Sequence, residues 1–220
     1  TCGKSLGWTG GVNRRAVSEL VISFAIAMLR RVPAAYREVM GGTWRQHVGR
    51  NLTGSTVGII GCGHVGKDLV ELLKPYECTI LIHDILDFSD FDRAKGTRSV
   101  TLEELLRASD VVTLHVPLDD STRHMLNAQR LALMKTSAIL INVARGGLVD
   151  EVALKLRLKG NLLAGAAFDV FAVEPPQDLE LLALDNFLVT PHIGGSSQEA
   201  ILAMGRAAID GLDTHHIPGA

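Results

Sequence analysis

Residues 56–66 read TVGIIGCGHVG, a run of strand-favouring residues followed at once by three closely spaced glycines. The first five residues are typical of a buried strand, and Gly61, Gly63 and Gly66 form the pattern G-x-G-x-x-G where a helix would begin. Glycines at these places allow a tight turn and let backbone N–H groups approach a phosphate closely. The stretch therefore predicts a strand–turn–helix unit that holds a pyrophosphate.

The glycine pattern alone is a weak signal, because glycines cluster in many turns. Here the run Thr79–His83 predicts a second strand, and Asp84 follows it 18 residues after Gly66. A carboxylate at that point accepts hydrogen bonds from ribose hydroxyls and repels a 2′-phosphate, which favours NAD over NADP. The structural alternative is a generic tight turn beside a solvated aspartate.

The rest of the chain alternates strands and helices in the same way. Apolar runs predict further strands at 111–116, 138–143, 164–168 and 187–190, and continuous apolar runs suit parallel strands covered on both faces. Capping residues predict helices that begin near Thr101, Asp150 and Ser196-Ser197, the last continuing to about Leu212. We therefore expect an α/β fold with a doubly wound parallel sheet, Rossmann-like.

Outside this alternation, Asn13 is placed to cap a helix that runs through Arg30, with Pro33 following. The middle of that helix is apolar almost all round, so it is buried or packs against another chain. The most polar stretch, 84–96, is expected to be a surface loop. We expect one domain over residues 1–220, with its core at about 14–200 and a C-terminal helix over 201–220.

Composition excludes several classes of protein. The 220 residues are 47% hydrophobic and 21% charged with a net charge of −2, which is ordinary globular composition and gives no field for nucleic acid or an anionic membrane. The longest apolar run, Leu20–Leu29, is broken by Ser23 and is too short to cross a bilayer. We expect neither nucleic acid nor membrane as a partner.

Cysteine and histidine usage carries two further expectations. Cys2, Cys62 and Cys78 are odd in number and form no C-x-x-C pair, which favours a reducing compartment, with the cytoplasm as the default. A disulfide between two of them is a minor alternative. Remaining histidines lack metal-ligand spacing, so no metal is expected; these are His47, His83, His124, His215 and His216.

Polar side chains follow three successive predicted strands, on the side where ligands bind in such sheets. Arg145 offers a bidentate fork for a substrate carboxylate. His192 is a candidate acid/base for the oxygen of a keto acid, and Glu174 is placed to hold its imidazole and favour the protonated form. Each alone has a plainer explanation: a surface arginine, an exposed acid beside two prolines, a loop histidine. Their joint position favours hydride-transfer chemistry on a 2-keto acid.

At this point the sequence resembles the D-isomer-specific 2-hydroxyacid dehydrogenases, over roughly residues 13–213. The resemblance rests on specific motifs: GCGHVG at 61–66, LHVPL at 114–118, NVARGG at 142–147, FDVFAVEPP at 168–176 and TPHIGGS at 190–196. Residues 11–20, GVNRRAVSEL, look most like the D-3-phosphoglycerate dehydrogenase branch of the family, as does SDVVTLHVP at 109–117.

The resemblance implies a role for each matching residue. Arg145 would bind the substrate carboxylate, Glu174 would orient the histidine, and His192 would donate the proton. The remaining positions would contact NAD: Gly61, Gly63, His64, Val65 and Gly66 at the pyrophosphate, Asp84 at the adenosine ribose, Val116 and Pro117 at the adenine side, and Val143, Ala144, Asp169, Gly194 and Gly195 at the nicotinamide. His115 is a cofactor candidate that is equally well explained as structural.

The resemblance implies a separate substrate-binding domain of about 100 residues before this point, to which the helix at 201–220 would return. We expect the given sequence to begin partway through such a two-domain enzyme. The expected activity is hydride transfer between NAD and a D-2-hydroxy acid such as 3-phosphoglycerate. Alternatives are a glyoxylate or hydroxypyruvate reductase, an NAD-sensing corepressor-like binding protein, and a non-catalytic nucleotide-binding remnant. The apolar helix before the first strand suggests a homodimer built through this domain.

Overall fold

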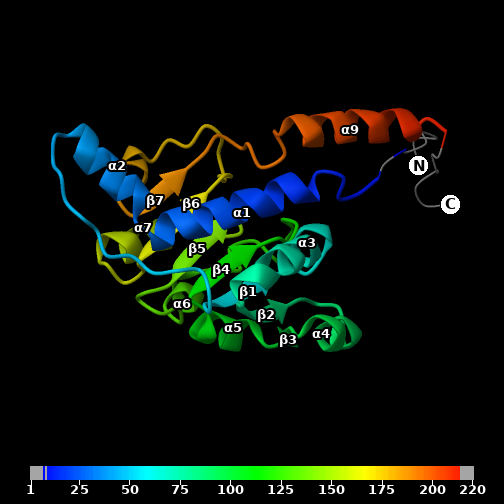
Figure 1. Ribbon diagram of the computed structural model, residues 1–220, viewed down its shortest axis with the longest axis horizontal. Coiled ribbons are helices and arrows are strands. Elements are labelled where there is room, and N and C mark those ends of the chain that lie inside the picture. The colour runs from blue at the N-terminus through cyan, green and yellow to red at the C-terminus, as the bar shows by residue number, and fades with distance from the viewer. Residues whose placement is uncertain (1–6, 8, 214–220) are drawn as a thin grey trace.

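The fold is a sheet of seven parallel strands in the order β3-β2-β1-β4-β5-β6-β7, seen in a computed structural model that describes residues 7 and 9–213 (Figure 1). The strands are β1 Thr56–Ile60, β2 Thr79–His83, β3 Arg98–Ser99, β4 Val111–Leu114, β5 Ile139–Asn142, β6 Gly165–Phe168 and β7 Phe187–Val189. The predicted doubly wound parallel sheet is confirmed.

The order of the strands places a crevice in the sheet. Strand β1 pairs with β2 on one side and with β4 on the other, so that Val57 lies opposite both Ile80 and Val111. The direction of winding changes between β1 and β4, so the helices that follow them, α3 (His64–Leu73) and α6 (Ala128–Leu131), lie on opposite faces of the sheet. In open α/β sheets this is where a ligand binds.

Helices cover both faces of the sheet (Figure 1). One face carries α1 Arg14–Leu29 and α3 His64–Leu73, and the other carries α5 Leu102–Ala108, α6 Ala128–Leu131 and α7 Glu151–Lys159. Neighbouring residues of β1 serve the two layers in turn: Ile59 packs in the cluster that contains α1 and α3, and Ile60 packs in the cluster that contains α5 and α7. This explains why apolar residues follow one another in β1 instead of alternating with polar ones.

Among the described residues, five helices begin at side-chain caps, and three of them are the helices for which the sequence predicts a cap. Thr101 accepts the N–H of Glu104 at the start of α5, and Asp150 accepts the N–H of Ala153 at the start of α7. In α9, Gln198–Asp210, the cap is Ser197 rather than Ser196, and it accepts the N–H of Ala200. Each such cap stabilises its helix by about 1 kcal/mol.

The stretch 84–96, expected to be a surface loop, contains the helix α4 Ser89–Lys95. Acidic residues lie in its first turn, Arg93 and Lys95 lie in its last turn, and Gly96 ends it in the left-handed conformation. Those are helix signals on a segment too short to show apolar periodicity. The prediction of a loop was wrong there.

The segment after α1 also differs from expectation. Helix α1 ends at Leu29, and Arg31 adopts the left-handed backbone conformation. Pro33 was expected simply to follow the first helix, but it lies in the first turn of a second helix, α2 Val32–Met40. Arg37 ties α2 to the body by hydrogen bonds to the Leu184 carbonyl and the Asp185 carboxylate, both at 2.9 Å. Short helical turns complete the fold: η1 Lys74–Tyr76 and α8 Leu179–Leu182.

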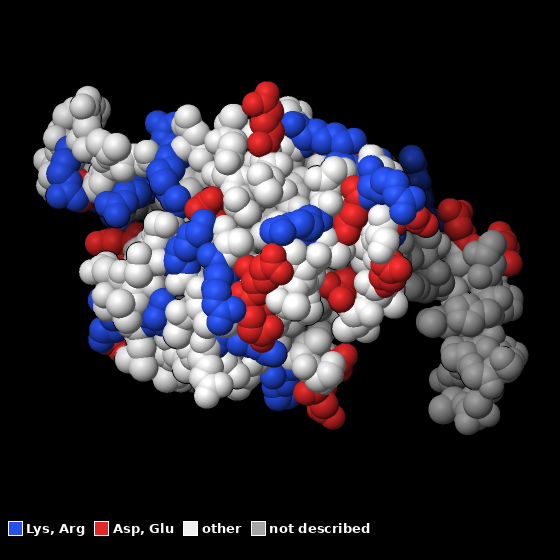
Figure 2. Space-filling view, turned by 90° about the horizontal axis from the view of Figure 1, so that it is seen from below, with Lys and Arg blue, Asp and Glu red and all other residues white. Residues whose placement is uncertain are grey.

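Charged side chains of both signs lie on the surface, and the two described cysteines are free thiols. On the face seen in Figure 2, Lys and Arg are interspersed with Asp and Glu. Among the residues described, no helix is long and apolar enough to cross a membrane. Cys62 is buried and Cys78 half-buried, and both are free thiols. Cys2, His215 and His216 lie outside the described residues.

Candidate active site

The predicted site residues all lie at the carboxyl edge of the sheet, in two groups. One group follows β1, β2 and β4 and contains the glycine-rich loop and Asp84. The other follows β5, β6 and β7 and contains Arg145, Glu174 and His192. A ligand as long as a dinucleotide would extend from the first group to the second.

The glycine-rich loop needs its glycines for different reasons. Gly61 has φ +96°, and a Cβ there would lie 2.8 Å from the His115 carbonyl carbon. A Cβ at Gly66 would lie 2.4 Å from the Gly61 oxygen, so α3 approaches the loop too closely for any side chain. A Cβ at Gly63 would meet nothing within 4 Å. Close packing therefore requires glycine at positions 61 and 66, whereas Gly63 faces open space.

These features fit a pyrophosphate. No side chain caps α3, so the N–H groups of its first turn, from His64 to Gly66, remain available to an anion. The open space beside Gly63 lies at that same helix start, where a Cβ would crowd an incoming phosphate. The side chain of His64 packs against Gly11, where a Cβ would lie 2.3 Å from the ring. The segment before α1 therefore borders the loop.

Asp84 is tied to the glycine-rich loop directly. One carboxylate oxygen accepts the Cys62 N–H at 2.7 Å, and the other accepts the Leu86 N–H at 3.0 Å. Each carboxylate oxygen has more than one acceptor position, so both can still accept a hydroxyl. The carboxylate thus fixes the loop and keeps acceptor capacity for a ribose.

Residues 115–117 leave β4 next to this loop. The His115 N–H donates to the Ile60 carbonyl at 2.7 Å, and the ring Nε2 lies 3.1 Å from the Thr113 hydroxyl. Removal of the ring from water lowers the pKa of His115 to about 3, so the ring is neutral at physiological pH. Val116 packs against Gly61, and Pro117 is exposed. These contacts support a structural role for His115 as readily as a cofactor contact.

Glu174 and His192 meet in the second group. The His192 Nδ1 lies 3.0 Å from one oxygen of Glu174, and the other oxygen accepts the Phe171 N–H at 3.1 Å. Both side chains are open to solvent. Because Nδ1 faces the carboxylate, the Nε2 atom is left to face a ligand. His192 itself has left-handed backbone, with φ +56°.

The surroundings of Glu174 keep it ionised. The hydrogen bond to His192 lowers the pKa of Glu174, and the Phe171 N–H and the positive charge of Arg145 lower it further. An ionised carboxylate at Nδ1 stabilises the protonated imidazole. The pair is therefore arranged so that His192 can carry a proton and give it up from Nε2.

Asp169 holds the loop that carries His192. It is 1% exposed, and its carboxylate accepts the Thr190 hydroxyl at 2.5 Å and the N–H groups of Ile193 and Gly194 at 2.8 and 2.7 Å. Its carbonyl accepts the His192 N–H at 2.9 Å. The hydrogen bonds of Asp169 therefore fix the conformation of this loop.

The loop is close-packed at its glycines. A Cβ at Gly194 would lie 3.0 Å from the Asp169 carboxylate, and one at Gly195 would lie 2.9 Å from the Asn13 side-chain nitrogen. Both positions therefore favour glycine, and the loop is pressed against the start of α1.

Arg145 is exposed, and its backbone is shaped by Asn142. The buried Asn142 side chain donates to the Arg145 carbonyl at 2.9 Å and accepts the Ala144 N–H at 3.1 Å. Val143 between them is buried and Ala144 half-buried. The turn presents the guanidinium beside Glu174, as its effect on the pKa of that residue indicates.

Several residues that build the site escaped the sequence analysis. Asn142 and Thr190 were read only as strand ends, and the N–H of Phe171 leaves no trace in the sequence. Polar side chains at the last position of an apolar strand, such as Asn142, were the available signal. No cluster of three or more His, Cys, Asp or Glu side chains able to hold a metal occurs among residues 7 and 9–213.

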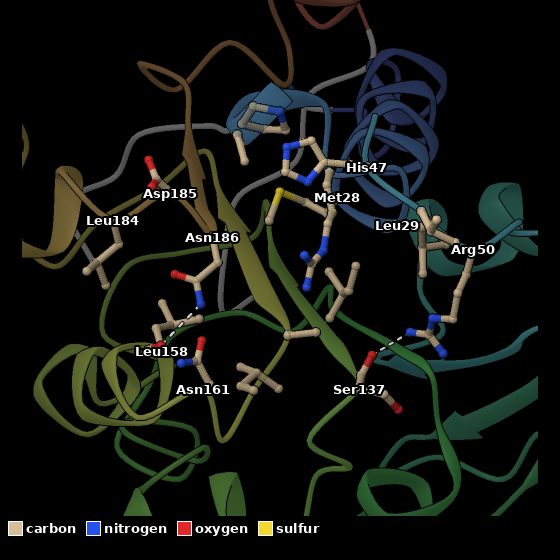
Figure 3. Close-up of a pocket in the computed structure, with 18 of the residues that line it drawn as sticks. Met28, Leu29, His47, Arg50, Ser137, Leu158, Asn161, Leu184, Asp185 and Asn186 are labelled. Carbon is tan, nitrogen blue, oxygen red and sulfur yellow. Dashed lines mark hydrogen bonds between the residues drawn. The ribbon is translucent and has the colours of Figure 1, made fainter. Parts of the chain in front are cut away.

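A pocket of about 720 Å³ lies away from this site. It opens at the amino ends of β5 and β6, beside Ile139 and Ala164, whereas the candidate site lies at the carboxyl ends (Figure 3). Its walls come from the end of α1, from α2 and from the segment 45–50. It is therefore separate from the groups that follow the strands.

Comparisons with known proteins agree with this geometry. The family model described as D-isomer specific 2-hydroxyacid dehydrogenase, NAD binding domain, matches residues 22–194. The chain is 40% identical over 193 residues to a D-3-phosphoglycerate dehydrogenase from Methanocaldococcus jannaschii, covering 86% of this chain and 37% of that protein. It is 37% identical over 211 residues to a glyoxylate reductase from Korarchaeum cryptofilum, covering 93% of this chain and 64% of that protein.

A solved structure shares the fold. A D-lactate dehydrogenase from Aquifex aeolicus, crystallised with NAD and lactic acid, superposes with a TM-score of 0.83 at 28% identity, over 91% of this chain and 66% of that one. The chain spans less than two thirds of the length of both curated relatives named above.

Proposed function

Because the chain belongs to the family of NAD-binding domains of D-isomer-specific 2-hydroxyacid dehydrogenases, with NAD as its cofactor, we propose that it serves an enzyme that transfers a hydride between NAD and a D-2-hydroxy acid. The observation that carries the proposal is the His192–Glu174 pair at 3.0 Å, placed at the carboxyl edge of the sheet beside Arg145. A proton donor, its orienting acid and a cation for a carboxylate are what reduction of a 2-keto acid requires.

The chain's own residues divide the work. NAD supplies the hydride when it is bound in its reduced form. Arg145 binds the substrate carboxylate through its two terminal nitrogens. His192 donates a proton from Nε2 to the keto oxygen, and Glu174 holds Nδ1 and stabilises the protonated ring.

The cofactor would lie along the first group of residues. The N–H groups of His64, Val65 and Gly66 bind the pyrophosphate, and Asp84 accepts the ribose hydroxyls. At the other end we place the nicotinamide beside Val143, Ala144 and the backbone of Gly194 and Gly195. Asp169 would bind the carboxamide of the nicotinamide only through the acceptor positions that its hydrogen bonds to the loop leave unused.

The test is turnover. The natural full-length protein is purified and mixed with NADH and each of a panel of 2-keto acids, and the loss of NADH absorbance is followed. Oxidation of NADH with any of them supports the proposal. NADH binding without turnover on any acid contradicts the enzymatic function and favours a nucleotide-binding remnant or a corepressor-like protein, which a peptide pull-down in the presence and absence of NADH separates.

Within the family we propose 3-phosphoglycerate as the substrate, because the motif segments at 11–20 and 109–117 are most like that branch. In the reduction assay its partner is 3-phosphohydroxypyruvate. A higher kcat/KM with glyoxylate or hydroxypyruvate would replace this substrate with the alternative. The site itself binds only the carboxylate that all of these acids share.

We also propose that the chain is the cofactor domain of a two-domain enzyme. Of the thirteen residues of α9, only Ala200 is buried, and Ile201, Leu202 and Ile209 are exposed. A substrate domain would cover this apolar face, exclude water from the keto acid and form the second wall of the cleft. The intact mass of the natural protein tests this: a mass about 10 kDa or more above 23.6 kDa supports a further domain.

A homodimer is the assembly we propose, with the cytoplasm as its compartment in view of the free thiols of Cys62 and Cys78. The buried face of α1 packs within its own chain, so the contact would lie further along, at α2 and the segment that follows it. That region exposes large apolar side chains: Tyr36, Met40, Trp44 and Val48. Trp44 is 86% exposed, although a tryptophan is normally covered in a stable protein.

The 720 Å³ pocket adjoins these side chains. It is lined by apolar residues such as Met28 and Leu158 and by polar ones such as His47 and Arg50 (Figure 3). The exposed segment and the pocket lie on the same chain. In a two-fold dimer, the segment of each chain would therefore enter the pocket of the other, and both surfaces would be buried in each chain.

Sedimentation of wild type and Trp44→Glu tests this assembly. A dimeric wild type and a monomeric variant with the same circular dichroism support the proposal. A monomeric wild type at micromolar concentration contradicts it.

A further inference from the structure

The loop that carries Glu174 is held from outside by the segment that carries Arg145. Two residues of that segment, Gly146 and Glu151, contact one peptide group, the bond between Phe171 and Ala172. We infer that Glu151 is a positioning residue: its carboxylate fixes this peptide group and thereby the turn that brings Glu174 to the N–H of Phe171. The inference rests on the proposed function for its effect on turnover, but not for its effect on Glu174.

Gly146 provides a backbone contact on one side of the peptide. A Cβ built on Gly146 would lie 1.9 Å from the Phe171 carbonyl carbon and oxygen and 2.3 Å from the Ala172 nitrogen. Only a residue without a side chain fits there. The turn that presents Arg145 is therefore in direct contact with the loop that presents Glu174.

Glu151 provides a hydrogen bond to the same peptide. Its Oε1 accepts the Ala172 N–H at 2.9 Å, and Glu151 is itself fixed as the first residue of α7, next to the capping residue Asp150. No other acceptor within the described residues is recorded for the Ala172 N–H. The start of a helix thus holds an otherwise exposed loop.

Phe171 transmits this constraint to the candidate catalytic pair. Its ring is 7% exposed and packs against Phe168 and Phe187, with centroids 6.0 and 6.2 Å away. Its N–H donates to Glu174 at 3.1 Å, and Glu174 holds His192. The ring fixes where Phe171 lies, and the hydrogen bond from Ala172 to Glu151 fixes how its backbone is turned. Without Glu151 the peptide between Phe171 and Ala172 can turn, and Glu174, three residues beyond Phe171 on the same loop, can move away from the Phe171 N–H.

The consequence is a change in the titration of Glu174. Three groups face its carboxylate: His192 from the loop after β7, Arg145 from the loop after β5 and the Phe171 N–H from its own loop, and all three lower its pKa. Loss of the Phe171 N–H therefore raises the pKa. Removing the negative charge of Glu151 acts in the opposite direction, so a variant matched in charge is needed.

The experiment compares Glu151→Ala with Glu151→Gln, which both lack the charge but differ in the acceptor oxygen. The pKa of Glu174 is measured by NMR from its side-chain carboxyl carbon, assigned by its disappearance in Glu174→Gln. We expect a higher pKa in Glu151→Ala than in Glu151→Gln. We also expect kcat to fall by about tenfold in Glu151→Ala, with little change in the Kd for NADH and with most of the loss restored in Glu151→Gln.

Controls separate this role from simpler ones. Glu199→Ala removes a first-turn glutamate from α9 and measures the cost of that charge to a helix. If Glu151→Ala does not fold, Glu151→Asp shortens the acceptor and keeps the charge, and it should raise the pKa of Glu174 relative to wild type. Equal pKa values in Glu151→Ala and Glu151→Gln overturn the inference. If the pKa values differ but wild type reduces no keto acid, the positioning role stands and the proposed function fails.

Discussion

Asp84 and Asp169 stand in equivalent places but are used differently. Each follows a strand, β2 or β6. From the loop that follows the neighbouring strand, β1 or β7, Asp84 accepts one backbone N–H and Asp169 accepts two. Asp169 is 1% exposed and accepts three donors, whereas Asp84 is half-buried and accepts only two. The acceptor positions of Asp169 are mostly used by the protein, whereas Asp84 keeps acceptor positions for a ligand.

The comparison shows that a carboxylate at a strand end can serve the fold, the ligand or both, according to burial and the number of donors. Burial strengthens each hydrogen bond and makes each unpaired donor costly. Asp169 should therefore matter most to stability, and Asp84 most to binding.

The largest effect is expected for Asp169→Ala. Removing the carboxylate leaves the Thr190 hydroxyl and the N–H groups of Ile193 and Gly194 without their acceptor, at a cost of about 3 kcal/mol in the free energy of unfolding. The loop that carries His192 should lose its conformation, so turnover should fall by at least about a hundredfold. Urea unfolding and NADH oxidation measure both effects. A variant as stable as wild type would show that water replaces the carboxylate.

His192→Asn should leave the fold and the Kd for NADH nearly unchanged while lowering kcat by about 10²–10⁴-fold, because it removes the proton donor and leaves the first group of residues intact. Steady-state kinetics and fluorescence titration with NADH separate the two quantities. A kcat equal to that of wild type would remove His192 from the mechanism.

A third variant, Asp84→Ala, should reverse the balance seen at Asp169. The free energy of unfolding should fall by only about 1 kcal/mol, since the Leu86 N–H is exposed and only the Cys62 N–H is left without an acceptor away from water. The Kd for NADH should rise about tenfold, and discrimination against NADPH should relax because the repelling charge is gone. Titrations with both cofactors test this. Should the Kd for NADH stay constant while stability falls by several kcal/mol, the two aspartates would be alike after all.

The smallest effect is a pH dependence. The pKa of Glu174 lies below its ordinary value of 4.5, so the carboxylate is charged above that pKa and becomes protonated as the pH falls through it. The rate of keto-acid reduction should therefore fall on the acid side only below about pH 4.5. Short initial-rate assays across this range check it, and Glu174→Gln should lack the acid limb.

Much of this fold could be predicted from the sequence, because a strand buried on both faces carries a continuous run of mostly apolar residues. Thr56–Ile60 and Thr79–His83 were located without error. Other strands were predicted longer than they are; 111–116 ends at Leu114, where pairing with β5 stops. The helix α4 was missed because its polar surface hides the periodicity.

The candidate site was predictable to the level of which side chains follow which strands. Glu174 and His192 were expected to meet, and they do, at 3.0 Å. Their supports were not predictable, because Phe171, Ala172 and Gly146 act through backbone atoms that any residue possesses. The tie from Asp84 to Cys62 was missed for the same reason.

The left-handed backbone of His192 restricts how this position can change during evolution. At φ +56° a β-branched residue is strongly disfavoured, whereas histidine, asparagine, aspartate and glycine are tolerated. Single substitutions that remove the imidazole and keep the loop therefore come from a short set. A descendant that lost catalysis but kept NAD binding should carry asparagine, aspartate or glycine at position 192. That residue would mark it as a former enzyme.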